Sequence, residues 1–291
     1  MRMDKAALAF DLLPLDWRGS PLRAEGLQAE EIRLRRGRAP ALLVRGRELP
    51  LSGRCVTEED MLRVLEKATG ASVHASAASL REGYINYRGL RIGVCGVFQR
   101  AGGERESLLR LSSLAIRIPR EYRGICGEAA DSLYRSADRS LLLAGAPGAG
   151  KTTALRELIR NLSERGLRIG VADERNELAA LDARGEGFDL GRCSDVVTGL
   201  PKAEAAMLLL RGMNPQLIAM DEITREEDLT ALDQISGCGV GILATVHGTC
   251  LRDLRQRSAY RRLLDRGLFQ SLLLVEQDGA RRVYRRESVG A

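Results

Sequence analysis

The chain has 291 residues, about twice the length of a usual single domain, so one large or two modest domains are expected. Hydrophobic residues make up 44% of it and charged residues 29%, with 8 prolines, which excludes a disordered tail, a collagen or a membrane bundle as its main state. The net charge is +6, and only four of the 45 basic residues are lysines: Lys5, Lys67, Lys151 and Lys202.

Short elements predominate in the first half of the chain. Alternating and apolar runs predict strands, a Thr-Glu-Glu-Asp sequence predicts a capped helix start, and Arg88-Gly89 predicts the turn of a hairpin. The expected elements are strands at 31–35 and 41–44, a helix from Thr57 to Gly70, and hairpin strands at 83–87 and 90–98. We therefore expect residues 1–120 to form a small α+β domain, followed by an interdomain segment at 121–139.

Strands and helices alternate in the second half, which predicts an α/β domain over residues 140–291. The expected strands are 141–144, 168–172, 217–220 and 240–246, and the expected helices are 152–164, 202–213 and 226–235. This order is typical of a parallel sheet covered by helices.

A glycine-rich motif after the first of these strands gives the strongest functional signal. The pattern G-x-x-x-x-G-K-[ST] is complete, and its residues are Gly145, Ala146, Pro147, Gly148, Ala149, Gly150, Lys151 and Thr152, with Thr153 next in the helix. Backbone N–H groups of such a loop cradle phosphates at a helix N-terminus. We predict that Lys151 reaches the β- and γ-phosphates of ATP and that Thr152 ligates Mg²⁺. The alternative is a glycine-rich turn with no ligand.

Two carboxylates follow the apolar strand 217–220, as in a Walker B motif. Asp221 is expected to hold the Mg²⁺ shell, and Glu222 to polarise the water that attacks the γ-phosphate. The alternative is a strand that enters a solvated turn.

Two further strand ends carry polar residues. An acidic box at 173–177 includes Glu174 and Glu177, and a Thr-Val-His-Gly box at 245–248 includes His247. Ligands bind at the carboxyl ends of strands in open α/β sheets, so these three side chains are candidate catalytic residues. A solvated helix cap and a packed histidine are the alternatives.

The order of P-loop, acidic box, Walker B and histidine box resembles the secretion-ATPase superfamily of type II and type IV secretion and pilus machines. Within it, the chain most resembles the stage III sporulation protein AA family. Segments that carry this resemblance are 31–35, 83–85, 91–96, 112–118, 173–177, 201–204 and 220–223. The superfamily usually has Glu-Asp in the acidic box and often Gly-Glu in Walker B, so both Glu174 and Glu222 remain candidates for the general base.

The resemblance implies a RecA-like ATPase domain and a homo-hexameric ring with nucleotide between the two domains. It implies that arginines complete the site: Arg117 and Arg120 are our candidates for N-domain phosphate contacts, and Arg175 and Arg211 for the role in trans, although each could be a solvated surface residue. It also implies a motor or assembly ATPase for a channel between mother cell and forespore. Such a protein would be cytoplasmic in the mother cell and reach the membrane through membrane-embedded partners.

Two other functions compete with this one. Residues 248–291 contain ten arginines and five carboxylates, which would suit a RecA-like nucleic-acid translocase. Only Tyr260, Phe269 and Tyr284 are aromatic there, which is poor material for stacking bases, so we do not expect nucleic-acid binding. A nucleotide-binding scaffold without turnover is the third possibility. The six cysteines form no C-x-x-C pair, so no metal cluster is expected.

Overall fold

The computed structural model divides into two compact units. Unit 1 comprises Met1–Arg120 and Ala180–Phe188, and unit 2 comprises Glu121–Ala179 and Asp189–Ala291. The residues that the structure describes are 5–18, 29–44, 46–51, 53–70, 83–101, 104–119, 122–136, 138–182, 184–278 and 281–289.

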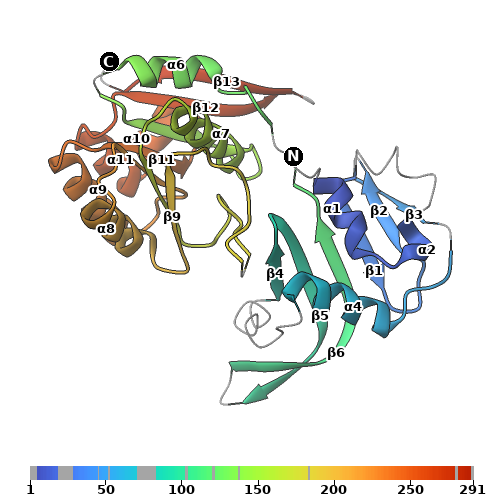
Figure 1. The fold of residues 1–291 in the computed structure, drawn as a ribbon. Helices are drawn as coiled ribbons and strands as arrows, with labels where there is room; N and C mark the ends of the chain where they lie inside the picture. Colours follow the sequence, from blue (N-terminus) through green and yellow to red (C-terminus); the bar gives the residue numbers. More distant parts are fainter. Residues whose placement is uncertain are drawn as a thin grey trace. The chain divides into compact units, whose positions relative to one another are not determined.

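Unit 1 is built on a six-stranded antiparallel sheet in the order β3-β2-β1-β6-β5-β4 (Figure 1). Its elements are α1 (Lys5–Leu12), α2 (Leu15–Arg18), β1 (Glu31–Arg35), β2 (Ala41–Val44), β3 (Arg47–Pro50), α4 (Glu58–Thr69), β4 (Tyr84–Tyr87), β5 (Leu90–Ala101) and β6 (Glu104–Arg117). The predicted hairpin joins β4 and β5. Its turn residues Arg88 and Gly89 both have positive φ angles, 48° and 85°, as a two-residue hairpin turn requires. Unit 1 is therefore the predicted α+β fold.

The start of α4 is held by a buried charged group. Thr57 and Asp60 form the predicted capping box, in which the Thr57 N–H donates to the Asp60 carboxylate at 2.9 Å. Arg54 donates two hydrogen bonds to the same carboxylate, at 2.5 and 2.7 Å, and stacks on the Trp17 ring at 4.8 Å from its centroid. The Arg54 hydrogen bonds hold the pKa of Asp60 well below its usual range. Trp17 is fully buried, so this cluster ties α4 to the core of unit 1.

Unit 2 is an α/β fold with a seven-stranded, mostly parallel sheet in the order β13-β12-β7-β11-β10-β8-β9 (Figure 1). Its strands are β7 (Leu141–Gly145), β8 (Ile169–Asp173), β9 (Ser194–Thr198), β10 (Leu217–Met220), β11 (Gly241–His247), β12 (Ser271–Asp278) and β13 (Arg281–Ser288). Its helices are α6 (Gly127–Arg135), α7 (Lys151–Glu164), α8 (Lys202–Gly212), α9 (Glu226–Gly237), α10 (Leu251–Gln256) and α11 (Ser258–Asp265). Among the strands described here for unit 2, β13 alone runs antiparallel to its neighbour.

Helices cover both faces of this sheet. The even-numbered apolar residues of the central strands pack in one core with α8, α9, α10 and α11, while α6 and α7 contact each other and α7 packs on β7 and β11. Because strand side chains alternate between faces, the odd-numbered residues of β7, β8, β10, β11 and β12 lie on the α7 face. Both faces of these parallel strands are therefore buried, as their near-continuous apolar sequences predict.

Two segments differ from the expected division of the chain. Residues 121–139 do not form a separate linker, because α6 lies in unit 2 and buries Ala130 and Leu133. Residues 180–188, expected within the ATPase domain, are grouped with unit 1, where the Lys5 ammonium donates to the Gly187 carbonyl at 3.3 Å. In the described part of the chain, none of the helices combines the length and apolar character needed to cross a membrane.

Replacing Asp60 should test the cluster at the start of α4. Asp60→Asn removes the charge that Arg54 pairs with, and we expect it to destabilise unit 1 by about 1–3 kcal/mol. Trp17 is the sole tryptophan, so urea unfolding followed by its fluorescence reports on unit 1. Glu59→Gln, on the exposed face of α4, is the matched control and should change stability by less than about 0.5 kcal/mol.

The same experiment has a defined pH dependence. The folded-state pKa of Asp60 is depressed, so its contribution is fully present above the unfolded value of about 4 and is lost as pH falls below it. The difference between wild type and Asp60→Asn should therefore shrink from pH 7 to pH 3. A difference that stays constant would contradict the role given to this carboxylate.

Candidate functional site

The phosphate loop connects β7 to α7 at the carboxyl edge of the parallel sheet. Gly148 and Gly150 have φ angles of 76° and 101°, a conformation that strongly favours glycine. A Cβ at Gly145 would lie 2.6 Å from the Val275 carbonyl oxygen, so a larger residue there would collide with β12. The nine predicted P-loop residues, Gly145 to Thr153, thus form a loop that opens directly into a helix N-terminus, as phosphate binding requires.

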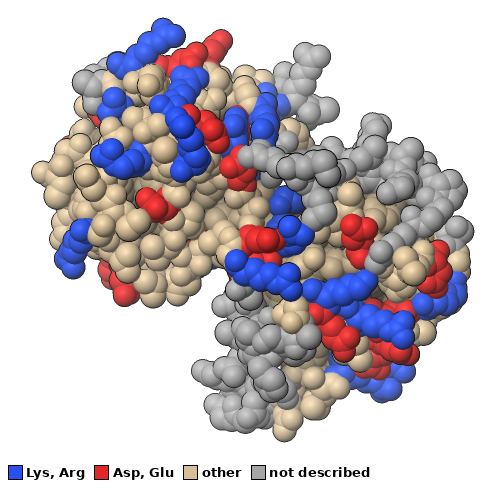
Figure 2. Space-filling view, in the orientation of Figure 1, with Lys and Arg blue, Asp and Glu red and all other residues tan. Residues whose placement is uncertain are grey.

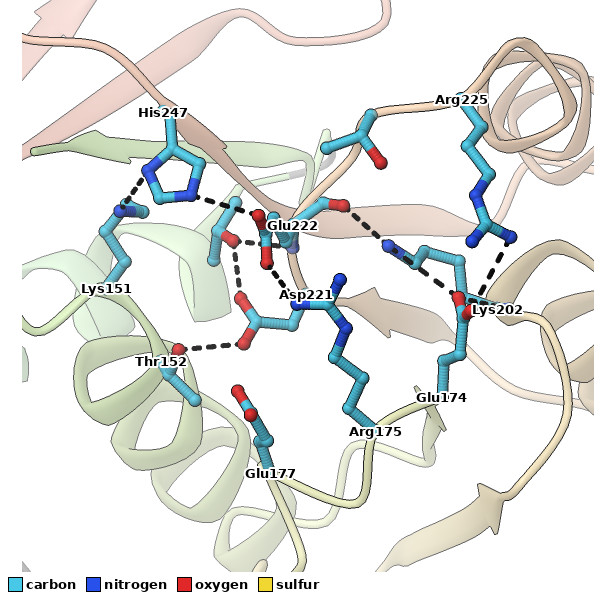
Figure 3. A network of polar contacts seen from close by, with 12 residues as sticks. Lys151, Thr152, Glu174, Arg175, Glu177, Lys202, Asp221, Glu222, Arg225 and His247 are labelled. Atoms are coloured by element: carbon cyan, nitrogen blue, oxygen red, sulfur yellow. Dashed lines mark hydrogen bonds and ion pairs between the residues drawn. The ribbon is translucent and has the colours of Figure 1, made fainter. Parts of the chain in front are cut away.

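The Lys151 side chain is folded back into this loop. Its ammonium donates to the Gly145 carbonyl at 3.0 Å and the Ala146 carbonyl at 3.1 Å, and it lies 3.1 Å from His247 Nδ1. Burial lowers the pKa of Lys151, while Asp221 and Glu222 favour its charged form. An ammonium can only donate, so His247 Nδ1 accepts and Nε2 carries the proton that is donated to Glu222 Oε1 at 3.1 Å. His247 therefore links the P-loop lysine to the second Walker B carboxylate (Figure 3).

Asp221, directly after β10, is hydrogen-bonded to β11 and to α7. It accepts a hydrogen bond from Thr152 Oγ1 at 2.8 Å and another from Thr245 Oγ1 at 2.5 Å. Thr245 is fully buried at the end of β11, and its hydroxyl oxygen in turn accepts from the Glu222 N–H at 2.8 Å. A hydroxyl and a carboxylate are oxygen ligands of the kind that Mg²⁺ prefers, so Thr152 and Asp221 fit the predicted metal site.

Glu222 has a left-handed backbone, with φ of 55°, although it is not glycine. Such a conformation is uncommon and costs energy for a residue with a side chain. Its carboxylate contacts His247 and also Arg175, at 3.1 Å, and its carbonyl accepts from the Lys202 ammonium at 2.6 Å. Contacts of the side-chain carboxylate and of the backbone carbonyl therefore hold Glu222 in this conformation.

Lys202 lies at the start of α8 and is 8% exposed. Besides the Glu222 carbonyl, its ammonium faces the carboxylates of Glu174 and Asp228, each at 3.9 Å, and Glu174 is also 3.5 Å from Arg225. These contacts bring α8, α9, the acidic box and Walker B to one point (Figure 3). In the sequence Lys202 stood out by family resemblance alone, and the structure supplies its physical role.

The acidic box contains two kinds of carboxylate. Asp173 is buried and accepts from the N–H groups of Glu177, Leu178 and Ala179, at 2.8 to 3.0 Å. Burial raises its pKa, and these N–H groups act in the opposite direction. Asp173 thus fixes the loop, whereas Glu174 and Glu177 line a small cleft with Asp221 and Glu222.

The four candidate arginines have different surroundings. Arg175 pairs with Glu222, as described, and its side chain is 67% exposed. Arg117, on β6 of unit 1, lies 3.6 Å from Glu31. Arg211 is exposed near the end of α8, and no partner for it is found among the described residues. Arg120 lies outside the described residues.

Unit 2 has a RecA-like fold, with the P-loop and the Walker B residues at the carboxyl edge of its parallel sheet. A solved structure of the pilus retraction motor PilT with bound ADP has a TM-score of 0.61 at 18% identity, over 89% of this chain and 78% of that one. The ATPase DotB of Legionella pneumophila gives 0.60 at 18% identity, over 90% of this chain and 77% of that one. These similarities establish the fold.

The chain belongs to the family described as sporulation stage III, protein AA, whose model matches residues 20–285. It is 34% identical over 254 residues to stage III sporulation protein AA of Bacillus subtilis, covering 85% of this chain and 82% of that protein. It is also 30% identical over 195 residues to the uncharacterized protein ycf45 of Porphyra purpurea, covering 66% of this chain and 34% of that one. The resemblance to this family is thereby confirmed.

Lys202→Met should destabilise unit 2, because it leaves two carboxylates facing each other and a carbonyl without its donor. We expect a loss of about 2–4 kcal/mol, seen as a lower denaturant midpoint of the unit 2 transition in far-UV circular dichroism. Arg261→Met, at an exposed position of α11, should leave this midpoint unchanged. Equal midpoints for the two variants would mean that Lys202 does not hold these elements together.

Proposed function

We propose that this protein hydrolyses ATP with Mg²⁺ as a motor or assembly ATPase of sporulation. The observation that carries the proposal is the contact of Thr152 with Asp221, which joins the P-loop to Walker B, with Glu222 held beside it through His247. A glycine-rich turn without a ligand would need neither a lysine buried against two carbonyls nor a buried hydroxyl aimed at a carboxylate.

In this proposal the residues of the chain divide the work. The N–H groups of the P-loop and the Lys151 ammonium bind the β- and γ-phosphates. Thr152 and Asp221 hold Mg²⁺, which when bound offsets the negative charge of the phosphates. Lys151 then exchanges its carbonyl partners for phosphate oxygens, which frees His247 Nδ1 from its present contact. Glu222 orients the attacking water and accepts its proton.

The surroundings of the two candidate bases favour Glu222 over Glu174. The Glu174 carboxylate faces the cationic groups of Lys202, at 3.9 Å, and Arg225, at 3.5 Å, and so serves to hold α8 and α9 at this edge. Glu222 directly follows the proposed metal ligand and is 34% exposed, so water can reach it. We therefore assign the general base to Glu222, and to Glu174 and Glu177 the shaping of the cleft.

The larger assembly is proposed from family membership and from the similarity in fold to the pilus retraction motor PilT. We propose a hexameric ring that acts in the mother-cell cytoplasm on membrane-embedded partners, with Arg175 and Arg211 as candidates for contacts in trans and Arg117 and Arg120 for phosphate contacts from unit 1. Arg175 forms an ion pair with Glu222. If a nucleotide bound to a neighbouring subunit attracted Arg175, this ion pair would break and the Glu222 carboxylate would be free to act as the general base.

The basic C-terminal region gives little support to nucleic-acid binding. Four of its arginines form ion pairs with acidic residues of unit 2: Arg257 with Asp253, Arg262 with Glu226, Arg266 with Asp233, and Arg285 with Glu276 and Glu287. Figure 2 shows acidic and basic side chains next to one another on the face in view. Part of the basic charge that a phosphate backbone would meet is thus neutralised within unit 2.

The base assignment is tested by two matched variants. Glu222→Gln should lower the ATP turnover rate by about 10²–10⁴-fold, because a removed general base costs this much, and it should leave ATP binding intact. Glu174→Gln should have a smaller effect. Turnover is measured by phosphate release and binding by fluorescence of a labelled ATP analogue. A larger loss of turnover in Glu174→Gln than in Glu222→Gln would assign the general base to Glu174. If the wild-type protein shows no turnover, even with its membrane partners, a nucleotide-binding scaffold without turnover would be favoured.

The ring proposal is tested with the hydrolysis-deficient protein. In ATP and Mg²⁺ the Glu222→Gln variant should sediment as a hexamer, because bound nucleotide is expected to join neighbouring subunits. The double variant Glu222→Gln/Lys151→Ala, which lacks the proposed phosphate-binding lysine, should sediment as a smaller species. Sedimentation velocity at several protein concentrations measures both. A monomer at the highest concentration with saturating ATP would contradict the ring.

A further inference from the structure

Lys5 holds a short segment of the chain that follows the acidic box. Its ammonium donates to the Arg88 carbonyl at 2.5 Å and to the Gly187 carbonyl at 3.3 Å, and it lies 5.4 Å from the centroid of the Phe188 ring. Gly187 and Phe188 end the segment 180–188, which belongs to unit 1, although the residues before and after it belong to unit 2. We call residues 180–188 the inserted segment.

The surroundings of Lys5 suit a lysine and not an arginine. A Cβ placed on Gly89 would lie 2.7 Å from the Lys5 nitrogen and 3.5 Å from the carbonyl carbon of Gly187, so the ammonium, the hairpin turn and the inserted segment are closely packed. A compact ammonium fits between two carbonyls at such a place, whereas a planar guanidinium is larger. This packing accounts for one of the four lysines of an arginine-rich chain.

Asp182 fixes the other end of the inserted segment. Its carboxylate accepts hydrogen bonds from the Arg88 N–H at 3.1 Å and, within the segment, from the N–H groups of Arg184 and Glu186 at 2.9 and 3.0 Å. The Glu186 carboxylate also pairs with the Arg88 side chain. The Arg184 guanidinium lies against Gly70, where a Cβ would be 2.8 Å from one of its nitrogens. The inserted segment is thus attached to α1, to the β4–β5 turn and to the end of α4.

The residues just before the inserted segment are held within unit 2. The N–H groups of Leu178 and Ala179 donate to the buried Asp173 carboxylate. The carbonyls of Glu177 and Leu178 accept from the Arg156 guanidinium at 2.6 and 2.7 Å. Arg156 lies on α7, the helix that begins at the P-loop. These contacts make the chain stiff from the acidic box to Ala179.

Ala180 lies between these two sets of contacts. Its φ is 47°, a left-handed conformation that is unfavourable for a residue with a Cβ, and it is buried. Such a conformation persists only where the surroundings hold it. Because the chain is held on both sides of Ala180, a displacement of residues 177–179 moves the inserted segment and is not absorbed by a slack loop.

Glu177 exposes this part of the chain to the nucleotide site. It lines the small cleft with Asp221 and Glu222, and Figure 3 shows its carboxylate pointing toward Thr152 and Asp221. Phosphates and Mg²⁺ in this cleft would change the charge that Glu177 faces. The inserted segment begins three residues further on, so a change in the position of Glu177 reaches it directly.

We propose that Lys5 is a positioning residue for the nucleotide site, because it holds the inserted segment on the β4–β5 turn and through this segment couples Glu177 to unit 1. The inference rests on the proposed binding of ATP at the P-loop. Glu177, drawn toward a bound cation, would restrain the chain before Ala180, so nucleotide binding should strengthen the contacts of the inserted segment. Coupling of this kind is reciprocal, and loss of these contacts should therefore weaken nucleotide binding.

Amide hydrogen exchange measures the coupling, because the Arg88 N–H is itself bonded to Asp182. The full chain is measured by mass spectrometry in Mg²⁺, with and without a non-hydrolysable ATP analogue. In wild type the analogue should slow exchange in the P-loop, in the acidic box and in residues 84–92. In Lys5→Met it should still slow exchange in the P-loop and the acidic box but not in residues 84–92. The dissociation constant of the analogue, measured by calorimetry, should rise about fivefold or more.

A second variant and a control separate this role from a merely structural one. Lys5→Met keeps the apolar stem of the side chain and the buried face of α1, so it should fold, as far-UV circular dichroism will check. Asp182→Ala releases the inserted segment from its other end and should give the same pattern of exchange. Lys67→Met is the matched control: this lysine of α4 donates instead to the Asp11 carbonyl, and its loss should leave the wild-type response intact.

The outcomes distinguish the inference from the function on which it rests. If the analogue slows exchange in the P-loop of wild type but leaves residues 84–92 unchanged, the coupling is overturned and ATP binding stands. The same holds if Lys5→Met and Asp182→Ala keep the full response in residues 84–92. If the analogue neither binds nor changes exchange anywhere in wild type, the proposed function fails, and the inference fails with it.

Discussion

The arrangement of the candidate site at the carboxyl edge of the parallel sheet depends on Asp221, because its two carboxylate oxygens accept hydrogen bonds from hydroxyls on two different elements. Thr152 reaches one oxygen from the first turn of α7, and Thr245 reaches the other from the end of β11. These contacts fix the P-loop helix relative to the parallel strands. A carboxylate at this position, rather than an amide, is what two O–H donors and a divalent cation both require.

The residue that follows Asp221 is constrained by the same geometry. Thr245 accepts the Glu222 N–H, and Lys202 donates to the Glu222 carbonyl, so the left-handed backbone of Glu222 is held from both sides. The carboxylate is thereby turned toward His247 and the P-loop lysine. Strain of this kind persists only where surrounding contacts hold it, and it is found preferentially at functional sites. Lys202 is a positioning residue here, since it acts on the backbone of Glu222.

Much of the fold could be predicted because its signals are local. The parallel strands are short apolar runs, and the P-loop and Walker B are contiguous motifs, so their elements fall within a few residues of the predicted bounds. The strand β13 was missed, because it lies at the sheet edge, where Arg-Arg-Val-Tyr-Arg-Arg carries little apolar alternation. The contact of Lys202 with Glu222 was also beyond prediction, since it depends on a left-handed turn twenty residues away. The roles of the candidate residues remain predictions.

The central claim is that Thr152 and Asp221 hold Mg²⁺ for a nucleotide bound at the P-loop. The affinity for ATP, measured with Mg²⁺ and again with excess EDTA, in wild type and in the isosteric Thr152→Val variant, tests it most directly. We predict that Mg²⁺ tightens ATP binding to wild type and that Thr152→Val loses this tightening while still binding ATP. Equal ATP affinity of wild type with and without Mg²⁺, or full tightening in Thr152→Val, would contradict the claim.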